Sequence, residues 1–401
     1  MISYLQNELD IQEIQMGLIS KKDLLNKVKF GNNVIVRGKK RNVAIGPDVL
    51  SKVISLVGLG SDNKRVEEMK KIEALANLPY KPDIFGDASI RNEKQPLYLD
   101  ILKVFDGPVS TNPTFCSFRE EKGIDEQEIL ETVEKQAEQG ITYMVIHAAV
   151  TKKLYELACK TRKIPTTSRG GTCILRDMQI NNKSEGIYIR IFPKLLKILK
   201  KHRITMSLGT TFRAAANIFT FDQVHLEELS LQSKLIKMAR DAGVRTILEV
   251  LSHSRLDQID EFSRLIQKDK QLKSVPINAL GPLGTDSTLG YDHVNAAATA
   301  SYAAYKKIAH IFVVVTRSEH IGGIPSYENI IEGLKCMRTA IHIANVARYP
   351  QLDQVMGQQR NTDKSCMLSS KGLFPEEAIN IDKIGKCTRC GNLCPYISFK
   401  K

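Results

Sequence analysis

The chain has 401 residues, of which 42% are hydrophobic, 25% are charged and 6% are aromatic. This hydrophobic fraction is enough for a large buried core and excludes an intrinsically disordered protein. The formal net charge is +14, which suits nucleic acids but equally small phosphorylated molecules. Because the basic residues are dispersed and do not alternate with aromatic ones, we expect no nucleic-acid partner.

The beginning of the chain, MISYLQNELDIQEIQ, lacks the basic and apolar stretches of a secretion signal. No apolar run approaches the roughly 20 residues that cross a bilayer. We therefore expect a cytoplasmic protein without membrane contact. In that compartment, closely spaced cysteines bind metals or take part in catalysis more often than they form disulfides.

Short β-rich runs alternate with helical patterns along the chain. A helix is expected at 124–140 and another at 225–243, since each has acidic residues in its first turns and ends at a glycine. Strands are predicted at 52–57, 82–85, 108–111, 143–147, 164–167, 204–208, 245–249, 276–280 and 310–315. This alternation indicates parallel βαβ units. Nine runs favour an α/β fold of the (β/α)8 barrel type, with one run too many, over an open doubly wound sheet.

The pattern divides the chain into four parts. Residues 1–45 are predicted to form an N-terminal extension, residues 46–350 a barrel domain, residues 351–374 a linker and residues 375–401 a cluster-binding segment. The densest basic run, KLLKILKKHR at 194–203, has Leu and Ile at helical spacing. We interpret its charges as the solvated face of a helix.

Polar residues gather at the ends of the predicted strands, where barrel enzymes carry their chemistry. A single histidine is usually structural, but six successive strand ends with charged or glycine-rich segments indicate a site. The run SRGGT at 168–172 offers backbone amides, a hydroxyl and a guanidinium, which suit a phosphate group. His253 and His320 can meet across the barrel mouth and hold one divalent metal ion, zinc or iron, with an open position.

The last 15 residues contain Cys387, Cys390 and Cys394 in the pattern C-x2-C-x3-C-P. Three thiolates can hold three irons of a [4Fe–4S] cluster and leave the fourth for S-adenosylmethionine (SAM), whose one-electron cleavage gives an adenosyl radical. A zinc knuckle with Cys366 or a histidine as fourth ligand is an alternative, and a ferredoxin-like electron carrier is another. The barrel beside the cysteine tail favours the radical interpretation.

Five motifs, in this order, resemble the phosphomethylpyrimidine synthase family, the radical-SAM enzymes that make the thiamin pyrimidine. They are VIHAAVT at 145–151, TSRGGT at 167–172, SLGTTFR at 207–213, LGPLGTDSTLGYDHV at 280–294 and VTRSEHIGGIP at 315–325. The resemblance implies a (β/α)8 barrel, a [4Fe–4S] cluster with SAM, and aminoimidazole ribotide as the substrate. It also implies a reductant protein such as ferredoxin or flavodoxin, and a dimer in which the cysteine segment serves the partner's site.

The resemblance assigns roles to residues that match the motifs. Phosphate binding falls to Ser168, Arg169 and Gly170, and further substrate contact to His147, Arg213 and Glu249. Glu249 and His147 are the expected catalytic residues. The implied metal ligands are His253 and His320, and the implied cluster ligands are Cys387, Cys390 and Cys394.

The sequence departs from the family where substrate contacts are expected. Two amides are replaced by Ile54 and Leu56, a methionine by Gly86, two tyrosines by Phe115 and Asn278, and an aspartate by Thr210. The last cysteine also follows one residue earlier than in the family. We therefore expect the family branch that makes 5-hydroxybenzimidazole, the precursor of the cobalamin lower ligand. Thiamin pyrimidine synthesis is the alternative, and a non-catalytic partner subunit of a paired synthase is a further one.

Overall fold

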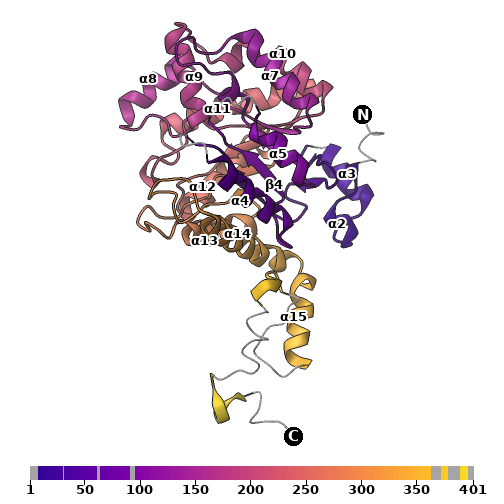
Figure 1. Cartoon of the computed structure of the whole chain (residues 1–401). Coiled ribbons are helices and arrows are strands. Elements are labelled where there is room, and N and C mark those ends of the chain that lie inside the picture. The colour runs from indigo at the N-terminus through magenta and orange to yellow at the C-terminus, as the bar shows by residue number, and fades with distance from the viewer. Residues whose placement is uncertain are drawn as a thin grey trace.

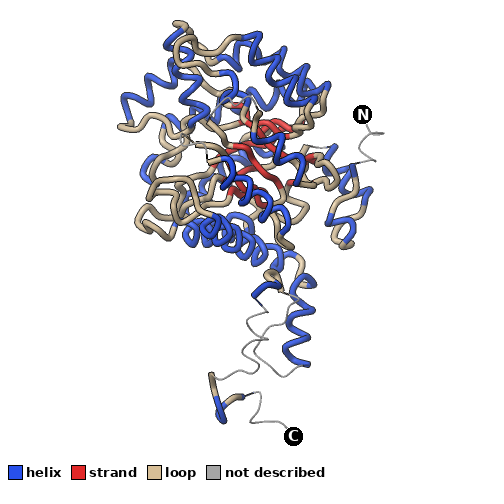
Figure 2. Tube along the Cα trace, in the orientation of Figure 1, coloured by secondary structure: helices blue, strands red, loops and turns tan. Residues whose placement is uncertain are grey.

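The computed structural model describes residues 8–29, 31–60, 64–90, 95–362, 372–377 and 389–395. Eight parallel strands close into a barrel in the order β10-β3-β4-β5-β6-β7-β8-β9 (Figures 1 and 2). The barrel strands are β3 (Lys52–Val57), β4 (Ile84–Asp87), β5 (Val109–Thr111), β6 (Tyr143–Ile146), β7 (Thr205–Leu208), β8 (Arg245–Val250), β9 (Ile277–Ala279) and β10 (Ile311–Val313). The predicted α/β fold of the (β/α)8 type is confirmed.

Helices cover the outside of the barrel, as Figure 2 shows. They are α4 (Arg65–Asn77), α5 (Leu97–Val104), α6 (Pro113–Ser117), α7 (Glu126–Glu138), α8 (Lys152–Thr161), α9 (Arg169–Ile180), α10 (Ile187–Lys201), α11 (Gln223–Ala242), α12 (Leu256–Lys268), α13 (Asp292–Tyr305) and α14 (Tyr327–Arg348), with short 3-10 turns η2 (Asn217–Phe219) and η3 (Leu272–Ser274). No helix in the described part of the chain combines the length and the hydrophobicity that crossing a membrane requires.

One predicted strand is wrong. Residues 164–167 form the loop between α8 and α9, because β6 pairs directly with β7 and leaves no place between them. The loop is held by side chains instead of a ladder: Thr166 Oγ1 donates to the carbonyl of Thr211 at 2.6 Å, and Thr167 Oγ1 donates to that of Arg213 at 3.3 Å. The other eight predicted runs all overlap barrel strands.

The two predicted helices are confirmed and both end at the predicted glycine, but only α7 has acidic residues in its first turn. Asp125 caps α7 by accepting hydrogen bonds from the amides of its first turn, and Gly140 follows with a φ of +107°. Helix α11 ends at Gly243, which adopts the left-handed conformation that a glycine allows at such an end. In α10 the leucines are buried while Lys194 and Lys197 are exposed, so the basic run is the solvated face that we predicted.

The N-terminal extension closes the amino end of the barrel. Strands β1 (Val34–Val36) and β2 (Val43–Ile45) form an antiparallel hairpin. Its valines and isoleucine pack with barrel residues Ile54, Ile84, Ile247 and Ile311 in one buried cluster. Helices α2 (Gln12–Gln15) and α3 (Lys21–Lys29) belong to the same extension, and α3 packs on the other side of the hairpin through Leu24. The extension therefore completes the core of the barrel.

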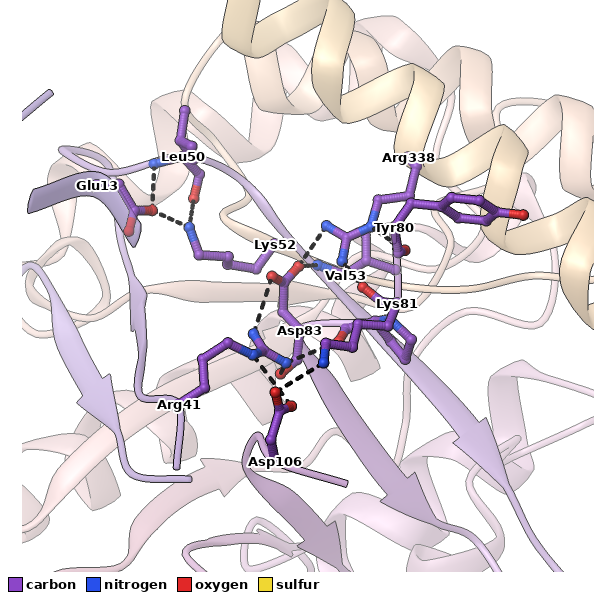
Figure 3. A network of polar contacts seen from close by, with 11 residues as sticks. Glu13, Arg41, Leu50, Lys52, Val53, Tyr80, Lys81, Asp83, Asp106 and Arg338 are labelled. Carbon is purple, nitrogen blue, oxygen red and sulfur yellow. Dashed lines mark hydrogen bonds and ion pairs between the residues drawn. The ribbon is translucent and has the colours of Figure 1, made fainter. Parts of the chain in front are cut away.

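Ion pairs join this extension to the barrel and to α14 (Figure 3). At their centre, the buried Asp83 lies before β4 and accepts a hydrogen bond from Arg338 of α14 at 2.7 Å. Arg41 of the extension lies 3.9 Å from the same carboxylate, and Lys52 of β3 pairs with Glu13 of α2. Burial alone would raise the pKa of Asp83, but Arg338, Lys52 and Arg41 hold that pKa below its usual value. This end of the barrel is built for stability.

The chain leaves the barrel after α14. Helix α15 (Gln351–Thr362) occupies the first half of the predicted linker and has no buried residue. Two short turns follow, η4 (Pro375–Glu377) and η5 (Gly391–Leu393). In Figure 1, α15 projects from the barrel and the segment 389–395 lies beyond it.

Candidate active site

The candidate site lies at the carboxyl ends of the barrel strands. A cavity of about 670 Å³ opens there, and Arg169, Arg213, His253 and His320 are among its lining residues. These four residues follow four different barrel strands, so the barrel brings together groups that are far apart in the sequence. A larger cavity of about 1020 Å³ lies at the amino end, but none of the predicted site residues lines it.

The SRGGT motif forms the first turn of α9. Ser168 is the N-cap, and its hydroxyl accepts a hydrogen bond from the Gly171 amide at 3.1 Å. The next two amides, of Arg169 and Gly170, are those that a helix leaves without internal acceptors. A side chain at Gly170 would lie 2.7 Å from the ring of His147, so glycine is required for this close approach. Free amides at a helix N-terminus suit a phosphate group.

The hydrogen-bond partners of His147 favour one of its two neutral tautomers. The side-chain oxygen of Asn112 accepts from the Thr114 amide at 3.1 Å, which turns its amide nitrogen toward Nδ1 of His147 at 3.5 Å. Nδ1 then accepts, so the proton lies on Nε2, which is 2.7 Å from Ser168 Oγ. Burial, reinforced by the charge of Arg213, lowers the pKa of His147 to about 3. The ring is therefore neutral at pH 7, and the hydroxyl proton of Ser168 is left to donate to a ligand.

Arg169 and Arg213 add positive charge to this side of the cavity. The guanidinium of Arg169 lies 5.8 Å from the ring centroid of Phe115, a cation–π distance that holds the flexible side chain near the α9 terminus. Phe115, which replaces a tyrosine of the family, lacks the hydroxyl group but still contacts Arg169 through its ring. Arg213 is half-buried in the loop after β7. Both cations can pair with an anionic substrate.

Glu249 on β8 is buried below the cavity lining, and its charge interacts with that of Arg213, which does line the cavity. Burial raises the pKa of Glu249 to about 7, although the charge of Arg213 opposes this. Its Oε2 atom has no hydrogen-bond partner among the described residues. Oδ1 of Asn278 also has no hydrogen-bond partner among them. The two residues are direct neighbours in the register of β8 and β9. A carboxyl group that titrates near neutral pH can give and take protons, and a bound ligand would satisfy these buried atoms.

Thr210 does not face the cavity. Its hydroxyl donates to the buried carboxylate of Glu228 on α11 at 2.7 Å, and the amides of Thr211 and Phe212 donate to the same group. Burial raises the pKa of Glu228 to about 7 in spite of these three hydrogen bonds. An aspartate at position 210 would place a second carboxyl group against the first, so the threonine and the glutamate fit together.

Two other departures from the family also fit together. Leu56 lines the cavity, and its Cδ2 atom would lie 2.5 Å from a side-chain carbon built on Gly86. A methionine at position 86 would require the end of the Leu56 side chain to move. The leucine therefore fills part of the space that the longer side chain would need.

The two predicted metal ligands meet at the mouth. The ring centroids of His253 and His320 are 5.4 Å apart. Nδ1 of His253 lies 2.7 Å from Asp286, and Nδ1 of His320 lies 2.9 Å from the buried Asp292. Carboxylates that bind Nδ1 in this way orient imidazoles so that Nε2 faces a metal ion. The pair fits two positions of an open divalent-metal site.

The structure does not bring Cys390 or Cys394 to this mouth. Cys387 lies outside the described residues. Cys390 is exposed and Cys394 is half-buried in the segment around η5, which Figure 1 draws away from the barrel.

Sequence reasoning missed four residues that hold the site together: Asn112, Glu228, Asp286 and Asp292. Asn112 is followed by a proline, a pattern typical of a helix start at a strand end. The two aspartates belong to the GTD and GYDH motifs, so the sequence could have predicted that they lie in the site. Glu228 sits in an ordinary helical pattern, and no local signal marks it.

Comparison with known proteins decides the family. The model of the "Radical SAM ThiC family" matches residues 7–401. The chain belongs to this family. Membership makes it one of the radical-SAM enzymes, which use a [4Fe–4S] cluster and SAM.

Relatives within the family carry two different names. The phosphomethylpyrimidine synthase of Ignicoccus hospitalis is 31% identical over 397 residues, covering 92% of this chain and 89% of the relative. The 5-hydroxybenzimidazole synthase BzaA of Eubacterium limosum is 29% identical, covering 92% and 90%. Among solved structures, a Yersinia pestis dihydropteroate synthase matches 79% of this chain with a TM-score of 0.45 and 10% identity.

Proposed function

We propose that this protein converts aminoimidazole ribotide to 5-hydroxybenzimidazole in a radical fragmentation and rearrangement. The observation that carries the proposal is a helix N-terminus with donors that suit a phosphate group, combined with altered groups around it. Ser168, Arg169 and Gly170, here called the phosphate cradle, keep the donors that a ribotide phosphate needs. Among the altered positions, Leu56 lines the cavity beside Gly86, so the departures change the shape of the space that a substrate would meet.

The residues of the chain would contribute binding, orientation and proton transfer. The cradle and Arg213 would hold the ribotide, and the neutral His147 would keep the Ser168 hydroxyl aimed at the phosphate. Glu249, whose pKa is raised to about 7 by burial, would exchange a proton with the aminoimidazole. His253 and His320 would hold one zinc or iron ion through Nε2. When bound through Cys387, Cys390 and Cys394, the cluster with SAM supplies the initiating radical.

An anaerobic assay tests this proposal. Purified chain would be mixed with the ribotide, SAM and a reductant such as flavodoxin, and products identified by mass spectrometry. We expect 5-hydroxybenzimidazole. Pyrimidine phosphate as the sole product would contradict the proposed branch. If product appeared only after a paralogous protein was added, the chain would be a subunit of a paired synthase, which we would then expect to be a heterodimer.

Thiamin pyrimidine synthesis is the second candidate. It is favoured by the 31% identity to the Ignicoccus hospitalis phosphomethylpyrimidine synthase. Both candidates use the same phosphate cradle, so Arg169→Gln is expected to weaken ribotide binding at least tenfold in either case. Arg176→Gln is the matched control, because Arg176 lies on the same helix and stacks on Phe118. Equal affinity of the two variants would contradict a phosphate role for Arg169.

A further inference from the structure

A short segment between α15 and the cysteines is bound to the side of the barrel. We define the tail anchor as residues 372–377, which include η4. The ring of Phe374 meets that of Tyr80 edge-on, with centroids 4.9 Å apart and an angle of 85°. Phe374 also packs against the main hydrophobic core. This segment is therefore seated on the barrel, whereas α15 before it buries no residue.

Lys335 of α14 is the central residue of this contact. Its ammonium group lies 2.8 Å from Glu376 and 2.6 Å from Glu377. It also lies 5.6 Å from the ring centroid of Phe374 and 5.8 Å from that of Tyr80. Partial burial disfavours its charge, but the two carboxylates raise the pKa of Lys335 above its ordinary value. One lysine thus contacts both the acidic and the aromatic residues of the anchor.

The barrel side of the contact is rigid. Tyr80 is buried and its hydroxyl donates to Glu376. Its carbonyl accepts from Arg338 at 3.1 Å, and Arg338 also binds Asp83 in the ionic network of Figure 3. Lys335 and Arg338 are about one helical turn apart and therefore lie on the same face of α14. Lys335 binds the tail anchor, and Arg338 binds the backbone at Tyr80.

The anchor restricts where the cysteines can go. Cys387 is 10 positions after Glu377 but 25 positions after Thr362, where α15 ends. A chain spans at most about 3.5 Å per residue, so the anchor lowers the maximum reach from about 90 Å to about 35 Å. A shorter tether raises the effective concentration of a tethered group at any site that it can still reach.

We propose that Lys335, Tyr80 and Phe374 form an anchoring site for the cysteine tail and are positioning residues for the cluster-bearing segment. The role of the tail rests on the proposed function, whereas the anchor itself does not. Lys335 does not line the cavity of the candidate active site, so its loss is expected to leave ribotide binding unchanged. It should loosen the tail and slow the cleavage of SAM.

The absence of tryptophan from the chain gives a direct test. Phe374→Trp in the full-length, anaerobically purified protein places a single fluorophore in the anchor. We expect emission typical of a half-buried indole, and adding Lys335→Ala should increase its quenching by acrylamide at least twofold. Lys306→Ala is the matched control, because Lys306 pairs with Asp260 and lies over Tyr302. Equal quenching with and without Lys335→Ala would overturn the anchor.

A second measurement covers the case in which tryptophan does not fit at position 374. Hydrogen exchange of the peptide spanning 372–377 should be faster in Lys335→Ala than in the wild type, with barrel peptides unchanged. Cleavage of SAM should fall several-fold in the same variant while ribotide affinity stays at the wild-type value. A loosened anchor with wild-type cleavage would overturn the positioning role. An inactive wild type would contradict the proposed function, and fluorescence and exchange would still report on the anchor.

Discussion

At the residue scale, several of the departures from the family come with structural partners. Thr210 bonds to Glu228, Leu56 occupies the space beside Gly86, and Phe115 lies under Arg169. Each pair joins residues from different elements, so single motifs do not show them. The sequence therefore predicts the groups that retain family motifs, such as Ser168, but not the groups whose meaning depends on a distant partner.

The Thr210 and Glu228 pair can be tested through protein stability. Burial raises the pKa of Glu228 from 4.5 to about 7, so the folded state holds a proton more tightly than the unfolded state. A group of this kind costs stability as the pH rises from 4.5 toward 7. Thr210→Asp adds a second carboxyl group beside it, and two adjacent carboxylates cannot both ionise without a large cost.

We expect Thr210→Asp to be about 3 kcal/mol less stable than Thr210→Ser at pH 8, with a smaller difference at pH 5. Urea unfolding at the two pH values measures this. Thr210→Ser keeps the hydroxyl that donates to Glu228 and is the matched control. An equal loss at both pH values would show that the new carboxyl group does not interact with Glu228.

At the element scale, eight of the nine predicted strands are correct. Each of them corresponds to a short, mostly buried run in the sequence. The remaining run, at residues 164–167, does not form a strand, and the structure gives a physical reason. Residues 164–167 have strand-like composition, yet their hydroxyls bind the carbonyls of the loop after β7. Composition reports local preference, whereas strand pairing depends on which partner is available. This loop matters because it places the first turn of α9 against His147.

That placement requires a glycine at position 170. A side-chain carbon there would lie 2.6 Å from Asn112 Nδ2 and 2.7 Å from the ring of His147. We expect Gly170→Ala to displace His147 from Ser168 and to weaken ribotide binding more than tenfold, with an unchanged circular dichroism spectrum. Calorimetric titration with the ribotide measures the affinity. Gly357→Ala in α15 is the control, since no atom lies within 4 Å of its new carbon, and wild-type affinity in Gly170→Ala would contradict the cradle.

At the scale of the whole molecule, the N-terminal extension contributes core to the barrel. From the sequence we predict an N-terminal extension over residues 1–45, and we assign no strand to it. The structure shows Val34, Val36, Val43 and Ile45 buried with the residues inside the barrel. Length and periodicity could not predict this packing, since it depends on contacts between segments far apart in the chain.

Asp83 is the residue through which extension, barrel and α14 are joined, because Arg41 and Arg338 reach it from either side. Asp83→Asn leaves those cations without their buried partner. We expect a loss of about 3–5 kcal/mol at pH 7, the usual result of breaking a buried ion pair. Asp241→Asn, which removes an exposed partner of Lys237, should cost far less, because solvent screens an exposed ion pair. Urea unfolding of the three proteins measures both effects.

The pH dependence of the loss identifies its cause. The pKa of Asp83 is held below its ordinary value of 3.8, so its stabilising effect is present above that value and is lost as the pH falls through the folded-state pKa. The difference between wild type and Asp83→Asn should therefore narrow as the solution is acidified below pH 3.8. A difference independent of pH would show that the asparagine disturbs packing and not charge, and that the ionic network does not stabilise the junction.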